Sequence, residues 1–283
     1  MRSIARRWRA ARGKAGRRLA ARRGRPDRRD PRIRLPVRVG RLLLDELYPR
    51  WCVLCGAEPA GRGGERYLCE ACVGRFPFIE APICPRCGRP YGAAPEPPPA
   101  CRGCLVPRSA GGLEWVRSAC RSAGGVRETL HLLKYRNCRW LGPDLARIAA
   151  ERLRAAVAAE GWDLLVPVPL HPRRQRERGF NQAEDLARCW GRAWGIALCS
   201  DALRRAKATL AQATLSSAAR RRNMAGAFAV ERPRDLRGRR VLLVDDVVTT
   251  GATLRELARV LAAAGDGGRP ARIGAVTLGR GGL

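Results

Sequence analysis

The chain has 283 residues, which is enough for one sizeable domain and a second, smaller one. It carries 56 Lys+Arg against 25 Asp+Glu, a net charge of +31, and arginine supplies 53 of the 56 cations. This strong arginine bias lowers the weight of any single arginine cluster. No stretch approaches the roughly 18 apolar residues of a transmembrane helix, so we expect no membrane span and a cytoplasmic protein.

Residues 1–41 hold a large share of the positive charge, with 17 Lys+Arg and two Asp. They show no sustained apolar periodicity, so we predict a disordered, arginine-rich extension. Two interpretations stay open: a basic arm that binds nucleic acid, or an extension without a function of its own. The pair Arg6-Arg7 is not followed by the apolar region that a secretory signal needs.

Eight of the twelve cysteines fall into four C-x-x-C pairs, with 13 residues between the first and second pair and again between the third and fourth. This internal duplication predicts a double zinc ribbon over residues 42–108, with two structural Zn²⁺ ions that are each held by four thiolates. Sequential pairing is favoured, and interleaved pairing stays open. Disulfides and iron–sulfur ligation are the weaker alternatives. The predicted ligands are Cys52, Cys55, Cys69, Cys72, Cys84, Cys87, Cys101 and Cys104.

Residues 113–283 show the pattern of an α/β domain with a mostly parallel sheet flanked by helices. Apolar residues at helical spacing predict one helix over 126–135 and another that begins at Pro143. A strand over 163–169 is stopped by its prolines, which cannot donate to a ladder. The later predicted elements are a polar loop over 171–179, a helix capped by Asn181 with Glu184, a short strand over 196–198 and a final strand over 271–278.

The segment from Val241 to Thr253 carries the most specific signal. Its apolar run predicts a strand buried on both faces, which ends in Asp245 and Asp246. A short loop of Thr, Gly and Ala then leads into a helix with an apolar stripe. Free N–H groups at a helix start bind phosphate, Gly251 allows a close approach, and carboxylates accept hydrogen bonds from sugar hydroxyls. One turn can therefore hold a ribose together with its 5′-phosphate.

This stretch, two acids followed by Thr-Thr-Gly-Ala-Thr, resembles the 5-phosphoribosyl-1-pyrophosphate (PRPP) motif of type I phosphoribosyltransferases. Two alternatives compete with it. Response-regulator receiver domains also begin with an apolar strand that ends in paired Asp. They need roughly a hundred further residues, whereas this chain ends at Leu283. The other alternative is a βα turn without a ligand, since short motifs give false positives.

A second polar segment, His171 to Gly179, follows the strand predicted over 163–169. Ligands in open α/β sheets bind outside the carboxyl ends of the strands, which places this segment near the Asp245 turn. Its four arginines suit a pyrophosphate, because guanidinium groups bind oxyanions in bidentate fashion. The competing interpretation is a solvated basic loop in an arginine-rich chain.

Further motifs occur along the chain: Leu133-Lys134-Tyr135, Val166-Pro-Val-Pro-Leu-His-Pro172, Arg178-Gly-Phe-Asn-Gln182, Thr209-x-x-Gln212 and Arg220-x-x-Asn223. Together with the cysteine repeats, they resemble the ComF (ComFC-like) family over residues 42–283. The resemblance implies a type I phosphoribosyltransferase fold behind a double zinc ribbon. It also implies a link to DNA uptake and natural transformation.

The resemblance gives ligand-binding roles to three segments and assigns no catalytic residue. It implies that PRPP is bound by Asp245, Asp246, Val247, Thr249, Thr250, Gly251, Ala252 and Thr253. It implies a pyrophosphate loop that contains His171, Arg173, Arg174, Arg178, Asn181 and Gln182. A flexible loop that closes over PRPP would contain Arg205, Lys207, Thr209, Gln212, Arg220 and Asn223. Mg²⁺ would arrive with the pyrophosphate.

Two functions are therefore expected. The first is a protein that binds PRPP or a related phosphoribosyl ligand, leaning toward a pentosyltransferase with an undefined acceptor. The alternative is a non-catalytic competence factor that binds single-stranded DNA and uses the fold as a scaffold, with DNA-uptake proteins as partners. Lys134, one of only three lysines, is either part of the active-site edge or an exposed helix-end lysine.

Overall fold

The computed structural model describes residues 51–57, 67–105, 112–206 and 226–282. All of them lie in one of the two units into which contacts divide the chain, Pro49–Leu283. The extension predicted over 1–41 lies outside the described residues. Within the described ranges, no helix combines the length and apolarity that crossing a membrane requires.

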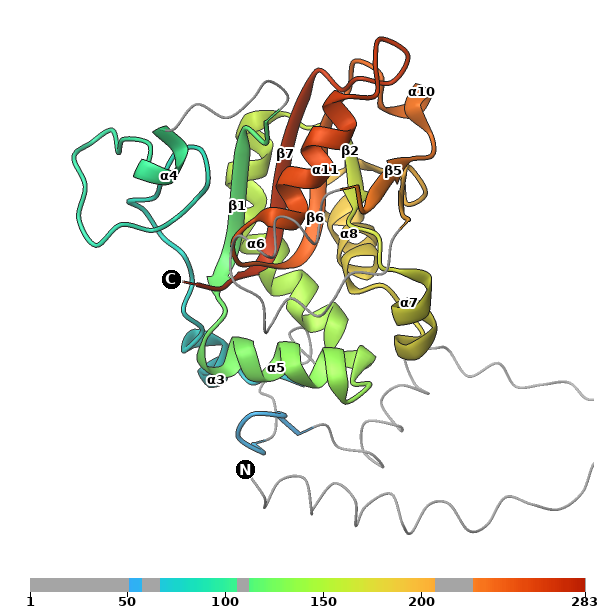
Figure 1. The fold of residues 1–283 in the computed structure, drawn as a ribbon. Helices are drawn as coiled ribbons and strands as arrows, with labels where there is room; N and C mark the ends of the chain where they lie inside the picture. Colours follow the sequence, from blue (N-terminus) through green and yellow to red (C-terminus); the bar gives the residue numbers. More distant parts are fainter. Residues whose placement is uncertain (1–50, 58–66, 106–111, 207–225, 283) are drawn as a thin grey trace, which may run out of the picture. The chain divides into compact units, whose positions relative to one another are not determined.

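A five-stranded sheet in which all neighbouring strands are parallel forms the centre of this unit (Figure 1). In spatial order its strands are β1 (Trp115–Arg121), β7 (Arg272–Arg280), β6 (Arg240–Val248), β2 (Leu164–Pro167) and β3 (Ala197–Leu198). Residues 241–244 of β6 are fully buried, as their apolar run predicts. The predicted α/β class with a mostly parallel sheet is confirmed.

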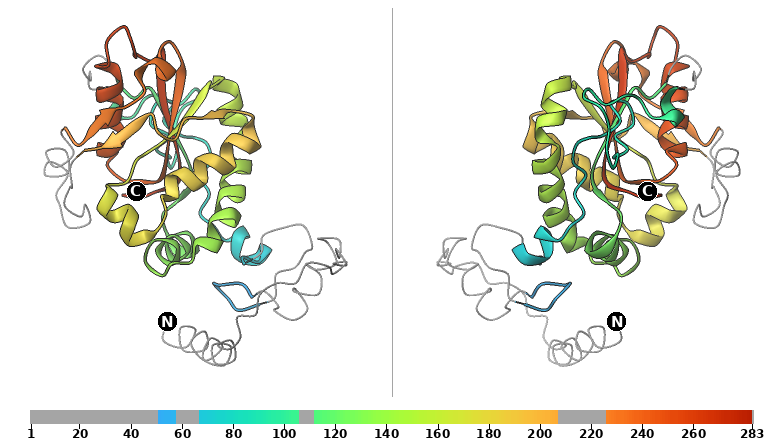
Figure 2. Two further views of the ribbon diagram at one scale, coloured as in Figure 1. Left: turned by 90° about the vertical axis from the view of Figure 1, so that its right-hand side faces the viewer. Right: turned by 90° about the vertical axis from the view of Figure 1, so that its left-hand side faces the viewer.

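Helices cover both faces of the sheet (Figure 1, Figure 2). On one face, α5 (Gly124–Tyr135), α6 (Gly142–Glu160) and α8 (Gln182–Trp194) pack against side chains such as Leu242 and Val276. On the other face, α11 (Ala252–Ala262) packs against Leu243. Figure 1 also shows that α5 crosses the carboxyl ends of the strands. The shorter elements are α3 (Glu70–Gly74), α4 (Arg102–Leu105), η1 (Arg139–Leu141), α7 (Pro172–Arg178), β4 (Leu203–Arg205), β5 (Phe228–Val230) and α10 (Pro233–Leu236).

The helix predictions hold in outline, with Pro143 in the first turn of α6 and Asn181 as the N-cap of α8. Three elements differ from the sequence analysis. Strand β1 and the antiparallel β4–β5 ribbon were not predicted. The polar loop predicted over 171–179 is the short helix α7, which His171 caps by accepting a hydrogen bond from Arg173 N at Nδ1.

Strand β6 is longer than its apolar run. The prediction that it ends in Asp245 and Asp246 is wrong, because the strand continues to Val248 and carries both residues within it. The physical reason lies in its two neighbours. Pairing with β2 stops at Pro167, opposite Val244, while pairing with β7 continues to Val248. The carboxylates therefore lie where β6 has a partner on one side only.

The cysteine-rich segment packs on the outer edge of β1. Ile79 N donates to Ala119 O at 3.0 Å, and Val116 N donates to Arg86 O at 2.8 Å. These hydrogen bonds occupy backbone groups that β1 does not use for pairing with β7. Earlier in the same segment, Tyr67 N donates to the Asp144 carboxylate in the first turn of α6, at 2.7 Å. The zinc-ribbon segment thus contacts both the sheet and the helix that follows α5.

Candidate functional site

The eight predicted zinc ligands form two clusters of four cysteines, 52/55/69/72 and 84/87/101/104. Within each cluster all Sγ atoms lie within 4.8 Å of one another. The Sγ atoms of Cys55 and Cys69 are 3.5 Å apart, and those of Cys87 and Cys101 are 3.6 Å apart. A tetrahedron with Zn–S bonds of about 2.3 Å has S···S edges of roughly 3.8 Å. The geometry therefore fits two closed zinc sites, and the pairing is sequential.

The two clusters have the same backbone hydrogen bond and the same glycine conformation, which confirms the duplication. In the first, Gly56 N donates to Cys52 O, and in the second, Gly88 N donates to Cys84 O. Both glycines have positive φ, 75° and 66°. Burial and the neighbouring thiols raise the pKa of Cys104. Four thiolates so close together need a cation to neutralise them, which is what Zn²⁺ supplies.

The two acidic residues of β6 meet a lysine from α5. The Nζ atom of Lys134 lies 2.7 Å from Oδ2 of Asp246, and both side chains are mostly buried, 21% and 13% exposed. Burial alone would lower the pKa of Lys134, but the charges of Asp246 and Asp245 raise it. The interpretation of Lys134 as an exposed helix-end lysine is therefore wrong. It belongs to the carboxyl edge of the sheet.

Asp245 differs from Asp246 in its electrostatics. Burial and the adjacent Asp246 charge raise the pKa of Asp245 to about 7, against a lowering effect of Lys134. One of its oxygens also accepts a hydrogen bond from Asp246 N at 2.9 Å. Near neutral pH, this carboxyl can therefore either accept hydrogen bonds or hold a proton.

The turn after β6 leads into α11 through a glycine with positive φ. Gly251 is the N-cap of α11 with φ 72°, and a Cβ there would lie only 2.9 Å from an Arg255 nitrogen. Thr250 Oγ1 accepts a hydrogen bond from Ala252 N at 3.4 Å. Of the other residues assigned to PRPP, Thr249 is exposed, Thr253 is half-buried, Ala252 is buried and Val247 packs against the core. Val247 and Ala252 therefore have only their backbone to offer a ligand.

The arginines assigned to the pyrophosphate loop do not all face the same way. Arg173 is exposed and forms an ion pair with Glu177 at 3.0 Å, one turn along α7. Arg174 and Arg178 are half-buried. Arg178 donates to Gln182 Oε1 at 3.2 Å. Arg174 and Arg178 are therefore partly covered by the protein, whereas Arg173 is ion-paired with Glu177 of its own helix.

Asn181 and Gln182 connect α7 to the sheet. Asn181 caps α8 by accepting from Ala183 N, and its Nδ2 donates to Val168 O at 3.1 Å. Gln182 is 3% exposed, and its Nε2 lacks a hydrogen-bond partner among the described residues. The cap is the one that the spacing of Asn181 and Glu184 predicts, whereas the hydrogen bond to Val168 O was not predicted.

Only the first residue assigned to the flexible loop is described. Arg205 ends β4 and stacks over Phe228 of β5, with its guanidinium carbon 5.5 Å from the ring centroid. Burial and the Arg174 charge lower the pKa of Arg205, and the Asp245 carboxylate raises it. Arg205 therefore lies within electrostatic reach of both other segments. The remaining assigned residues, Lys207, Thr209, Gln212, Arg220 and Asn223, lie outside the described residues.

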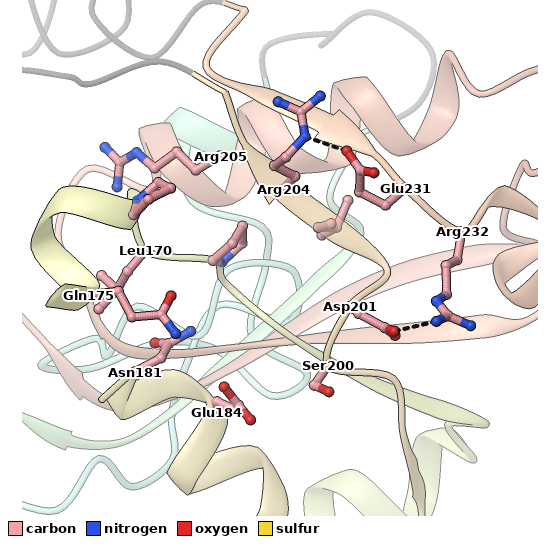
Figure 3. A pocket seen from close by; sticks show the side chains of 13 residues that line it. Leu170, Gln175, Asn181, Glu184, Ser200, Asp201, Arg204, Arg205, Glu231 and Arg232 are labelled. Atoms are coloured by element: carbon pink, nitrogen blue, oxygen red, sulfur yellow. Dashed lines mark hydrogen bonds and ion pairs between the residues drawn. The ribbon is translucent and has the colours of Figure 1, made fainter. Parts of the chain in front are cut away.

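A hollow of about 500 Å³ lies beside this site, at the carboxyl ends of β2 and β3 (Figure 3). Asn181, Gln175 and Ser200 line it from one side, and the β4–β5 ribbon lines it from the other. Its charges are mostly paired, since Arg204 bonds Glu231 and Arg232 bonds Asp201 at 2.7 Å. Asp245 and Asp246 are not among its lining residues. The hollow is thus a neighbour of the acidic pair, which lies outside it.

Comparison with known families agrees with both halves of this architecture. A double zinc ribbon domain matches residues 43–107, and a phosphoribosyl transferase domain matches residues 177–281. The chain is therefore a phosphoribosyltransferase-type protein with an amino-terminal zinc ribbon. It belongs to the ComF family of competence and DNA utilization proteins.

Three relatives illustrate the family. The DNA utilization protein YhgH of Escherichia coli (strain K12) is 33% identical over 219 residues, 75% of this chain and 91% of the relative. The competence protein ComFC of Bacillus subtilis (strain 168) is 30% identical over 220 residues, 75% of this chain and 83% of the relative. The competence protein F of Haemophilus influenzae is 37% identical over 132 residues, 45% of this chain and 58% of the relative.

Proposed function

We propose that this chain binds PRPP, or a closely related phosphoribosyl ligand, together with Mg²⁺ at the carboxyl edge of its sheet. The proposal is carried by one succession along the chain: Asp245 and Asp246 on β6, then Gly251 with positive φ, then the start of α11. The carboxylates suit the ribose hydroxyls. The N–H groups at the start of α11, which have no intrahelical acceptor, suit the 5′-phosphate, because the helix dipole attracts an anion there.

The carboxylate oxygens of this site also suit the binding of a Mg²⁺ ion. This ion prefers oxygen ligands and is usually held by one or two carboxylates together with substrate phosphates. Asp245 is the carboxylate available for this role, because Asp246 already holds Lys134. When bound, the ion would neutralise charge on the pyrophosphate. We assign Arg174, half-buried on α7, to the same anion, because guanidinium groups bind phosphates well.

We further propose that the chain is a pentosyltransferase. In such a reaction the bond between C1′ and the pyrophosphate oxygen breaks, and its electron pair leaves with the pyrophosphate. A nucleophilic acceptor then forms a new bond to C1′. This chain would hold the ribose through its acidic pair and would stabilise the departing charge with arginine, an electrostatic contribution typical of such sites.

We also propose domain bounds of 42–108 for the zinc ribbon and 113–283 for the phosphoribosyltransferase-like domain. We propose a cytoplasmic location, because a reducing compartment suits eight clustered thiols.

The test is a calorimetric titration of Mg²⁺–PRPP into the zinc-loaded, full-length protein. The key variant is Asp245→Asn with Asp246→Asn, which removes both charges while keeping the side-chain volumes. A matched control, Asp235→Asn with Asp266→Asn, removes two charges at exposed positions elsewhere. We expect binding by the wild type and the control and none by the key variant. Equal binding by all three proteins would reject the site.

A second candidate function is single-stranded DNA binding. It is favoured by the net charge of +31 and by the names of the relatives, which refer to competence and DNA utilization. Phosphate contacts release counterions, so affinity should fall steeply with salt, with a log–log slope of about −0.7 per contacted phosphate. Fluorescence anisotropy with labelled oligothymidylate at several salt concentrations measures this slope. A flat salt response would remove this candidate.

A further inference from the structure

Tyr135, the last residue of α5, is an exposed aromatic side chain at the carboxyl edge of the sheet. Its exposed fraction is 65%. The other large apolar side chains that are similarly exposed in the described residues, Trp51 and Leu105, belong to the zinc-ribbon segment. A single exposed ring is ordinary on a protein surface, so the argument depends on what surrounds this one.

The position of Tyr135 ties it to the acidic pair. It directly follows Lys134, whose ammonium group contacts Asp246 at 2.7 Å. The ring therefore belongs to the helix end whose lysine contacts the acidic pair that the proposed function assigns to the ribose hydroxyls.

Two further groups lie beside the ring. The Arg178 guanidinium carbon is 5.6 Å from the Tyr135 ring centroid, and the His131 ring is 5.0 Å away and tilted by 43°. Arg178 ends α7, the segment assigned to the pyrophosphate. The ring thus contacts the segment assigned to the pyrophosphate, directly follows the lysine that contacts the acidic pair, and is 65% exposed to solvent. On proteins that bind single-stranded nucleic acids, bases stack on aromatic side chains, and a neighbouring arginine adds a cation–π contribution.

We propose that Tyr135 is the stacking platform for a nucleobase whose ribose phosphate lies on residues 245–253. The ligand class is then a free ribonucleoside 5′-monophosphate, because the 5′-terminal sugar of a DNA strand lacks the two vicinal hydroxyls that the acidic pair would bind. This inference rests on the proposed phosphoribosyl site, which it deepens by naming a base. Stacking uses the π face that every base has, so the platform discriminates little between bases.

The test compares two ligands that differ only by the base, AMP and ribose 5-phosphate, by calorimetry on the full-length protein. Tyr135→Ala should weaken AMP binding by roughly 5- to 150-fold, the usual loss when one base–aromatic stack is removed, and should leave ribose 5-phosphate binding unchanged. Tyr135→Phe keeps the ring and should keep the AMP affinity. Trp51→Ala, which truncates an exposed ring elsewhere, is the matched control and should bind AMP like the wild type.

The other outcomes reject either the stacking platform alone or the proposed phosphoribosyl site as well. If Tyr135→Ala binds AMP normally, or loses AMP and ribose 5-phosphate to the same degree, the platform is rejected while the phosphoribosyl site stands. If the wild type binds neither PRPP nor ribose 5-phosphate, the proposed function fails and the platform fails with it. A 5′-phosphorylated oligothymidylate should bind at this site more weakly than AMP, because its terminal sugar has no vicinal hydroxyls. Binding at least as tight as that of AMP, and lost when the 5′-phosphate is removed, would overturn the assignment to a ribonucleotide.

Discussion

Lys134 and Asp246 join two distant parts of the chain through an ion pair of 2.7 Å at the carboxyl edge of the sheet. The lysine comes from α5, which crosses this edge, and the acid comes from β6, which ends there. The ion pair neutralises the Asp246 carboxylate and leaves the adjacent Asp245 carboxylate outside the pair. It also fixes α5, and with it Tyr135, against the strand that carries the acidic residues.

Replacing Lys134 tests how much this ion pair stabilises the fold. Lys134→Met leaves two acidic groups together without their cation, and breaking a buried pair typically costs 3–5 kcal/mol. Because this pair is partly exposed, we expect a smaller loss of about 1–3 kcal/mol in the free energy of unfolding at pH 8. Urea denaturation measures the loss. The double variant Lys134→Met with Asp246→Asn should recover most of it, and a single variant as stable as the wild type would contradict the argument.

The raised pKa of Asp245 predicts a dependence of stability on pH. Because the folded pKa of Asp245, about 7, lies above the ordinary value of 3.8 for an aspartic acid, the folded state holds this proton between about pH 4 and pH 7 while the unfolded state has lost it. Stability should therefore fall as the pH rises through this window. Asp245→Asn removes the charge and should stabilise the protein at pH 8 by on the order of 1–3 kcal/mol, with little effect near pH 4. Thermal unfolding of both proteins across the window is the measurement, and parallel pH curves would argue against a raised pKa.

Metal content tests the two cysteine clusters. We expect two Zn²⁺ per chain by elemental analysis, because each cluster supplies a closed set of four thiolates. Replacing Cys84 and Cys87 by serine should lower the content to one. Replacing Cys189 and Cys199, which lie outside both clusters, should leave it at two. A wild-type content of one or zero would show that the clusters are not both metal sites.

Two equivalent glycines of the repeated cysteine turns should respond differently to alanine. Both Gly56 and Gly88 have positive φ, which strains alanine by about 1 kcal/mol. A Cβ at Gly56 would meet no atom of the described residues within 4 Å, whereas one at Gly88 would lie 2.4 Å from Val116 O in β1. We therefore expect Gly88→Ala to cost roughly 1–3 kcal/mol more than Gly56→Ala. Chemical denaturation of the zinc-loaded variants measures the difference, and equal losses would mean that the contact with β1 relaxes freely.

Local patterns in the sequence account for much of the fold. The apolar run over 241–244 predicts a doubly buried strand, and the repeated cysteine spacing predicts two matched metal clusters, both of which the structure contains. Strand β1 was missed because its burial depends on partners elsewhere in the chain. Its residue Ser118 is buried through a hydrogen bond of 2.7 Å with Thr277 of β7. Such a pairing of polar side chains leaves no trace in apolar periodicity.

The candidate site likewise combines features that the sequence reveals with features that depend on tertiary packing. The acidic pair and the glycine turn are contiguous, so their spacing reveals them. The partnership of Lys134 with Asp246 depends on how α5 crosses the sheet, which no local pattern encodes. The extension of β6 past Val244 depends on where β2 stops. The one local hint to Lys134 is the rarity of lysine in a chain with 53 arginines.

The hydrogen bonds between residues 77–86 and β1 have a consequence for how copies of this chain meet. An open strand edge is a template on which another chain can add a strand. At one side of the sheet the edge strand β3 has only two residues, which is too short to recruit a partner strand readily. At the other side, seven-residue β1 is capped by the cysteine-rich segment. Because zinc holds that segment together, a cell starved of zinc should expose β1, and the protein should then begin to aggregate edge to edge.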